Sequence, residues 1–204
     1  MNFSDFGTLR EEQQLLADSL ARFVERDYGF ERRKAIVRGA GTSPEAWATL
    51  AELGVLALPI PADHGGFGGA AGDLLPVMNA LGRGLMVEPY LATVVLGAGA
   101  LALGGSDAQR TEWLPAVAEG RAKLALAAGG CTLRDGRLHG AANVVLHAAE
   151  ADGIVVAAGT QAFLVRRDAP GLALRAYRTI DGLRAADLVF DGVPGEPLPG
   201  GAAV

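Results

Sequence analysis

The sequence has one cysteine and no basic stripe, and both shortages exclude classes of protein. The single Cys131 can form no internal disulfide, and it belongs to no metal-ligand spacing. The formal net charge is −5, whereas a nucleic-acid-binding protein needs clustered Lys and Arg to neutralise phosphates. We therefore expect a protein of the reducing cytoplasm that holds no metal and binds no nucleic acid.

Long apolar runs are also scarce. The N-terminus, Met1 to Asp5, has no basic region followed by an apolar core, so no signal peptide is expected. One uncharged segment runs from Pro89 to Ser106, but glycines dilute it. Its core, Leu91 to Leu103, is shorter than the roughly 20 apolar residues that span a bilayer. We expect a buried helix of a helical domain and no membrane contact.

What the sequence does contain is helical pattern in its first 120 residues. Leu16, Leu20 and Phe23 recur at spacings of four and three, and Thr8 with Glu11 forms a capping box before them. Further helices are predicted over Ser43 to Gly54, Leu74 to Leu81, Leu91 to Leu103, and Ser106 to Pro115. The two serines are the predicted N-caps, and the proline is expected to disturb the last helix.

After Gly120 the pattern changes to short extended runs separated by turns. The runs are Lys123 to Ala127, Cys131 to Arg134, Arg137 to Gly140, Asn143 to His147, Ile154 to Ala157, Ala162 to Val165, Leu172 to Ala176, and Ala185 to Phe190. Asp135-Gly136 predicts a two-residue hairpin, because both positions of a type I′ turn need positive φ. No helical stretch separates the runs, as parallel strands would require, so antiparallel pairing is expected.

These patterns together predict an α+β fold. A helical domain is expected over residues 1–120 and a small antiparallel β-barrel or sandwich over residues 121–204. Half of the residues are hydrophobic and 20% are charged, which is the composition of an ordinary globular protein with a real core.

Two glycine patterns match the dinucleotide-binding sequence G-x-G-x-x-A, but neither has the context that this function needs. Residues 66–71 follow two prolines that would disrupt the strand delivering the loop. Residues 97–102 are followed at once by Gly104 and Gly105, which leave no room for the helix that would hold a pyrophosphate. Neither pattern is interpreted as a nucleotide site.

The histidines give no catalytic signal either. None of His64, His139 and His147 has a second histidine or a carboxylate at a metal-ligand or catalytic spacing, so loop or strand-surface positions are expected. Cys131 is interpreted as a small packing residue. From the residues alone, the prediction stops at a soluble α plus β protein of unknown function.

The order of several short segments is more informative than any single motif. In the helical half they are Leu53-Gly54, Pro61-Ala62-Asp63-His64-Gly65-Gly66, Leu81-Gly82-Arg83, and Gly105-Ser106-Asp107-Ala108-Gln109-Arg110 with Trp113-Leu114-Pro115. In the β half they are Ala151-Asp152, Asp168-Ala169-Pro170-Gly171, and Asp187-Leu188-Val189-Phe190-Asp191. In this order they resemble the acyl-CoA dehydrogenase family over essentially the whole chain.

This resemblance implies a flavin enzyme that removes two hydrogens from Cα and Cβ of an acyl-CoA thioester, with FAD as the cofactor. In the family a carboxylate base takes the α-proton, and that base comes from a helical bundle after the β domain. The sequence ends at Val204, where that bundle should begin. No residue is therefore assigned as catalytic.

The resemblance also implies where FAD would touch the chain, and there the sequence departs from the family. The residues carried over are Ala127 and Ala128 after the first strand, and Val144 and Leu146 in the position of an aromatic-Ile-Thr/Ser triplet. Compared with the family, a hydroxyl-bearing loop is absent near Gly129, and aliphatic side chains replace a hydroxyl that could bond the flavin ring.

Our hypothesis is an acyl-CoA dehydrogenase component in the cytoplasm that needs a partner chain or a missing C-terminal half for activity on an acyl-CoA. The expected partner is a homologous acyl-CoA dehydrogenase subunit or a second copy of the chain. The alternative is a non-catalytic subunit that pairs with a complete dehydrogenase. A divergent enzyme or a fragment, and oxidase or hydroxylase chemistry on the same scaffold, stay open.

Overall fold

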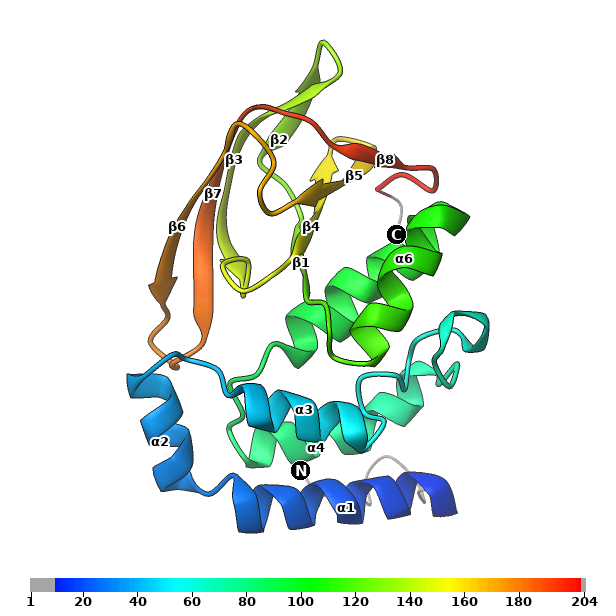
Figure 1. Cartoon of the computed structure of the whole chain (residues 1–204), viewed down its shortest axis with the longest axis vertical. Coiled ribbons are helices and arrows are strands. Elements are labelled where there is room, and N and C mark those ends of the chain that lie inside the picture. Colours follow the sequence, from blue (N-terminus) through cyan, green and yellow to red (C-terminus); the bar gives the residue numbers. More distant parts are fainter. Residues whose placement is uncertain (1–9, 203–204) are drawn as a thin grey trace.

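The computed structural model describes residues 10–202, which form a layer of helices beneath two stacked sheets (Figure 1). The helices are α1 (Glu11–Asp27), α2 (Phe30–Arg38), α3 (Pro44–Glu52), α4 (Leu74–Arg83), the π-helical η4 (Leu91–Ala98), α5 (Gly99–Gly104) and α6 (Asp107–Ala118). Two short 3₁₀ turns, η2 (Ala62–His64) and η3 (Ala71–Asp73), lie between α3 and α4. Within residues 10–202, no helix has the length and hydropathy to cross a membrane.

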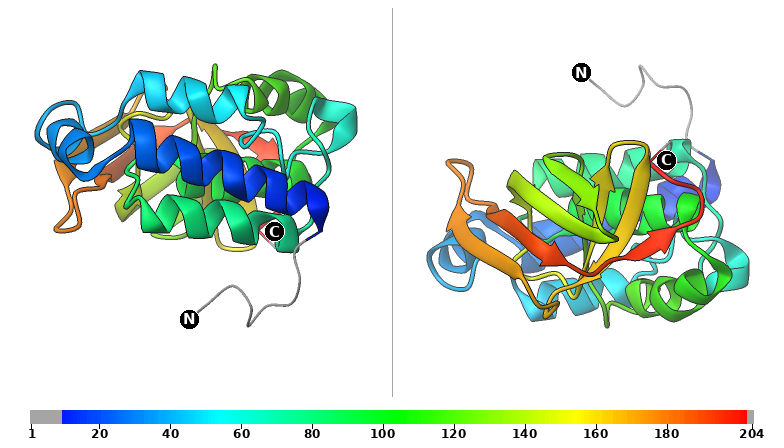
Figure 2. Two further views of the ribbon diagram at one scale, coloured as in Figure 1. Left: turned by 90° about the horizontal axis from the view of Figure 1, so that it is seen from below. Right: turned by 90° about the horizontal axis from the view of Figure 1, so that it is seen from above.

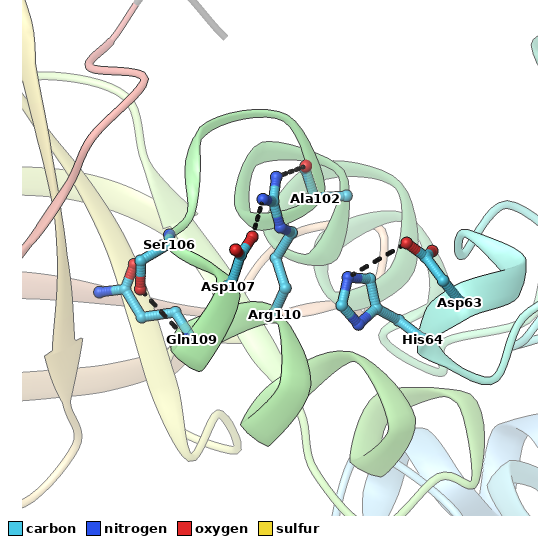
Figure 3. A network of polar contacts seen from close by, with 7 residues as sticks. All are labelled: Asp63, His64, Ala102, Ser106, Asp107, Gln109 and Arg110. Atoms are coloured by element: carbon cyan, nitrogen blue, oxygen red, sulfur yellow. Dashed lines mark hydrogen bonds and ion pairs between the residues drawn. The ribbon is translucent and has the colours of Figure 1, made fainter.

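The predicted caps at the two serines are confirmed. The Ser43 hydroxyl accepts a hydrogen bond from the amide of Ala46 at 3.2 Å, with Pro44 as the first helical residue. At α6 the bonds are reciprocal: Ser106 Oγ accepts from the Gln109 amide at 3.2 Å, and Gln109 Oε1 accepts from the Ser106 amide at 2.9 Å (Figure 3). The cap predicted at Thr8 lies outside the described residues.

Two features of the helical layer differ from the prediction. Helix α2 was not predicted, because none of its residues is buried and so no apolar periodicity marks it. Helix α6 does not end at Pro115 but continues to Ala118. The buried side chains of Trp113, Leu114 and Val117 hold this turn on the core despite the missing amide.

The β half is a sandwich and not a closed barrel. The strands are β1 (Leu124–Ala127), β2 (Cys131–Arg134), β3 (Arg137–Leu146), β4 (Gly153–Ala158), β5 (Gln161–Arg166), β6 (Leu172–Arg178), β7 (Arg184–Val193) and β8 (Glu196–Leu198). One sheet has the order β1-β4-β5-β8 and the other β2-β3-β7-β6. Asp135 and Gly136 both have positive φ, 50° and 73°, which confirms the hairpin.

The strand prediction was wrong at two places. The two runs predicted within residues 137–147 form the single strand β3, which is interrupted by an irregularity between Ala142 and Val145. Strand β1 pairs with β4 in parallel, although all other pairs are antiparallel. A parallel pair needs a crossover connection between its strands. Here β2 and β3, which belong to the other sheet, form that connection between β1 and β4, so no helix is needed.

The β1-β4-β5-β8 sheet is buried on both faces. Val155 and Leu164 point to the helices and join their core, whereas Ile154 and Val156 point to the second sheet and pack with Phe190. Figure 2 shows the strands lying over the helical layer. Because the first sheet shares a core with the helices, the division of the chain at residue 120 stays a prediction.

The β6–β7 hairpin reaches down to α2 and is fastened there (Figure 1). Arg178 Nη1 donates to the carbonyl of Val37 at 2.6 Å. Arg184 Nη2 donates to the carbonyls of Gly39 and Ala40 at 3.1 and 2.8 Å. Guanidinium groups can donate to the free carbonyls at the end of a helix. These bonds therefore join the β half of the chain to the helical half.

Candidate functional site

A pocket of about 330 Å³ lies where the helical layer meets the β half. We call it the seam pocket. Its walls come from the end of α4, the loop of residues 84–90, the start of η4, the turn after β3 and the β6–β7 hairpin. Half of the lining residues are Leu, Met or Val, namely Met78, Leu81, Leu85, Met86, Val87, Leu91, Leu146 and Leu183. This combination of size and apolar lining is typical of a small-molecule site.

Arg33 closes one side of the seam pocket. Its Nε donates to the Leu85 carbonyl at 2.6 Å, and its Nη2 donates to the Asp181 carbonyl at 2.8 Å. One guanidinium therefore joins the loop before η4 to the hairpin of the second sheet, and it fixes the distance between two walls.

Glu88 brings a buried carboxyl to the pocket wall. The residue is 7% exposed, and its Oε1 accepts a hydrogen bond from the Ser43 amide at 3.2 Å. Among residues 10–202, Oε2 has no hydrogen-bond partner. Burial raises the pKa of Glu88, because a carboxylate loses its hydration there.

His147 is the second buried polar residue on the wall. It lies in the turn after β3, one of the expected positions, but it is buried and not exposed. The residue is 4% exposed, and its Nδ1 lies 3.6 Å from Oε2 of Glu150. In the described part of the chain, neither atom has a hydrogen-bond partner. Its backbone has a φ of 52°, and its amide donates to the Arg184 carbonyl at 2.9 Å. The spacing of three between His147 and Glu150 was the available signal.

The four residues predicted to contact FAD are divided between two places. Ala128 and Val144 border a surface hollow of about 430 Å³ at the end of β1, which we call the strand-end hollow. Leu146 lines the seam pocket. Ala127 is buried in the core between the sheets and faces neither. That any of the four contacts FAD stays a prediction.

The rim of the strand-end hollow is held by Asp187. Its Oδ1 accepts from the Val144 amide at 3.1 Å and from the Tyr177 hydroxyl at 2.8 Å, while Oδ2 accepts from Arg175 at 2.7 Å. The bond from Arg175, followed by those from Tyr177 and Val144, lowers the pKa of Asp187. The carboxylate thus keeps Val144 at a φ of 55°.

The strand-end hollow does not fit an FAD held by this chain alone. Asn143 supplies the single polar side chain among its lining residues, and the amides of Ala141 and Val144 already donate to Gly130 and Asp187. The polar edge of a flavin carries several carbonyl and nitrogen acceptors. Each acceptor that is buried without a donor costs about 1–3 kcal/mol.

Other chemical groups give no second centre. In residues 10–202, no group of three His, Cys, Asp or Glu side chains is placed to hold a metal ion. His64 lies 3.9 Å from Asp63 at the surface, near the Asp107–Arg110 ion pair of α6 (Figure 3). Burial raises the pKa of the Cys131 thiol to about 11, which makes it unreactive.

Residues 10–121 match the family model described as "Acyl-CoA dehydrogenase, N-terminal domain", which is more than half of the chain. The chain belongs to the acyl-CoA dehydrogenase family. The match covers the helical layer from α1 to the end of α6, and therefore includes the seam-pocket residues that precede β1.

Curated acyl-CoA dehydrogenases extend the likeness into the β half. FadE28 of Mycobacterium tuberculosis is 31% identical over 191 residues, which are 89% of this chain and 51% of that protein. IpdE2 of Mycolicibacterium smegmatis is 36% identical over 114 residues, 55% of this chain and 35% of that one. The chain spans about half, or less, of the length of these acyl-CoA dehydrogenases.

Solved structures show the same fold. A variant of the Tcur3481-Tcur3483 steroid ACAD matches with a TM-score of 0.87 at 29% identity, over 96% of this chain and 59% of the other. The ChsE4-ChsE5 complex from Mycobacterium tuberculosis matches with a TM-score of 0.85 at 26% identity, over 97% and 59%. The described residues thus have the acyl-CoA dehydrogenase fold in both halves.

Proposed function

We propose that this chain is one component of an acyl-CoA dehydrogenase that acts together with a homologous partner chain. The chain holds the acyl part of a CoA thioester in the seam pocket, and the partner supplies the base and most hydrogen bonds to FAD. The observation that carries the proposal is the donor-poor strand-end hollow on an otherwise retained family fold.

The seam pocket supports the acyl-binding role. Its volume of about 330 Å³ lies at the lower end of ligand pockets, and its aliphatic walls favour a hydrocarbon chain or ring system. Burial of apolar ligand surface contributes about 25 cal/mol per Å². Specificity would then depend on the few polar groups of the wall, Arg33, Glu88 and His147.

The need for a partner is supported by two observations. The ChsE4-ChsE5 structure, which this chain resembles, is a complex of two proteins. Ala128, Val144 and Leu146, which would border a flavin, offer it no side-chain donor. The same observations favour the second candidate function, a non-catalytic subunit that stabilises a complete dehydrogenase.

Reconstitution tests the proposal. The chain is co-expressed with candidate full-length members of the family, and each purified complex is assayed by dye reduction with CoA thioesters of linear acids and of a steroid side chain. The last is included because one matched structure is a steroid ACAD. We expect turnover by the complex and none by either chain alone. If the partner is equally active alone, the result favours the non-catalytic role. If the chain forms a complex with none of the candidates, the result contradicts both proposed functions.

A further inference from the structure

The glycine at position 82 lines the seam pocket without being required by the packing of the chain. Gly82 lies inside α4, where its backbone is helical. Among residues 10–202, a Cβ added to Gly82 would meet nothing within 4 Å beyond its chain neighbours and the backbone of its own helix. Glycine is less favourable than alanine within a helix, so the missing side chain does not stabilise the chain itself.

Gly84, two residues later, differs in this respect. A Cβ at that position would lie 2.8 Å from Cγ1 of Val24, because α1 and the end of α4 approach each other too closely for a side chain between them. Gly82 has no such neighbour. The open space beside it is therefore available to a molecule outside this chain.

That space belongs to the seam pocket. Met78, Leu81 and Gly82 all line the pocket. Residues three and four positions after Met78 lie on the same side of a helix as Met78. A side chain at position 82 would therefore project from the pocket side of α4 and reduce the space for a ligand.

The gap lies at the mouth of the pocket and not at its floor. Gly82 is exposed, as are three large lining residues, Met78, Leu85 and Leu91. The lining residue Val87, in contrast, is completely buried. A missing side chain at the mouth increases the width of the entrance and leaves the depth of the pocket unchanged.

We propose that Gly82 widens the mouth of the seam pocket for an acyl group that carries a ring or a branch, and that it is a specificity-determining residue in addition to the polar groups of the wall. The inference rests on the acyl-binding role proposed for this pocket. A linear acyl chain is one methylene wide and passes without the gap, whereas a ring would meet a side chain at position 82. The exposed Met78, Leu85 and Leu91 provide apolar contacts for such a ring.

Two thioesters of equal length but different width test this proposal. Octanoyl-CoA and 4-cyclohexylbutanoyl-CoA are titrated by calorimetry into the full chain, alone and in complex with its partner. We expect Gly82→Leu to weaken the binding of the cyclohexyl thioester by at least about tenfold and that of octanoyl-CoA by about twofold at most. The smaller Gly82→Ala should weaken only the cyclohexyl thioester, by about threefold.

The matched control is Gly99→Ala. Gly99 is also helical, and among the described residues its added Cβ would meet nothing within 4 Å, but it does not line the seam pocket. This variant should keep both affinities. The melting temperature of Gly82→Ala should rise by about 2 °C, because alanine favours the helix. A lower melting temperature would show that the fold requires this glycine, and would overturn the inference.

The remaining outcomes separate the inference from the proposed function. If Gly82→Leu changes neither affinity, or weakens both thioesters equally, Gly82 does not select by width, while the acyl-binding role stands. If Gly82→Leu loses the complex with the partner but keeps both affinities, the gap serves the partner and the inference is wrong. If neither thioester binds the unmodified chain in either form, the acyl-binding role itself is contradicted.

Discussion

Val144 is a β-branched residue whose backbone has a φ of 55° and whose side chain is 56% exposed. A left-handed conformation costs an ordinary residue roughly 1–2 kcal/mol, and no buried contact of the side chain compensates for it. The Asp187 carboxylate holds the amide of Val144 in place. The strain lies at the rim of the strand-end hollow, where the resemblance places the flavin.

We predict that Val144→Gly raises the free energy of unfolding by roughly 0.5 kcal/mol, since relief of strain exceeds the added entropy of the unfolded chain. Val189→Gly is the matched control, because Val189 is 51% exposed in the neighbouring strand β7 and has no positive φ. That variant should lose about 0.5–1 kcal/mol. If urea unfolding shows that both variants lose the same free energy of unfolding, the backbone of Val144 is not strained.

Glu88 is a second residue in an unfavourable environment, because its carboxyl group is buried. Burial raises its pKa, so the folded chain keeps this proton to a higher pH than the unfolded chain, whose glutamates titrate near 4.3. The folded state then binds more protons, and stability falls as the pH rises from about 4 through the raised pKa.

We therefore predict that the melting temperature of Glu88→Gln gains on the unmodified chain as the pH is raised from about 4 to 8. The glutamine Oε1 can still accept from the Ser43 amide. A melting temperature of Glu88→Gln that falls relative to the unmodified chain as the pH rises would rule out the assigned burial effect.

At the scale of elements, α2 is fixed by residues far away in the sequence. None of its side chains is buried, and its last carbonyls accept from Arg178 and Arg184 of the β6–β7 hairpin. The helix therefore depends on tertiary contacts more than on its own packing face.

Removal of Arg184 should loosen this end of the structure. For Arg184→Ala we predict amide hydrogen exchange at least about fivefold faster in α2, which is a loss of about 1 kcal/mol of local stability. Arg137→Ala is the matched control, since Arg137 donates to the Gly192 carbonyl at 2.9 Å within the second sheet. Unchanged exchange in α2 after loss of Arg184 would contradict the role of the hairpin.

Local chemistry explains which elements could be predicted from the sequence. Ser43, Ser106 and the Asp135-Gly136 turn act on their immediate neighbours, and each was predicted. The parallel β1–β4 pair depends on a chain path through another sheet, and α2 depends on distant arginines. Neither the parallel pair nor α2 could be predicted from the periodicity of the sequence.

The same division holds for the candidate site. That Ala127, Ala128, Val144 and Leu146 contact FAD stays a prediction from the resemblance. The structure places Ala128, Val144 and Leu146 at the edges of two hollows and Ala127 in the core. The burial of Glu88 and His147 depends on tertiary packing, and among residues 10–202 the one hydrogen-bond partner of the Glu88 side chain is the amide of Ser43, 45 residues away. Single-sequence reasoning has no signal for that burial.

At the scale of the whole molecule, the two hollows have opposite properties. The seam pocket is enclosed by both halves and carries buried polar groups, whereas the strand-end hollow is lined by small aliphatic residues. The chain is thus equipped to hold an apolar ligand and poorly equipped to hold a flavin. This difference supports the proposal that a partner chain supplies the flavin contacts.

Equilibrium dialysis of FAD against the purified chain, alone and in complex with its partner, tests that claim most directly. We predict a dissociation constant weaker than about 100 μM for the chain alone and tighter than about 1 μM for the complex, a difference of more than about 2.7 kcal/mol. Submicromolar binding of FAD by the chain alone would contradict the account.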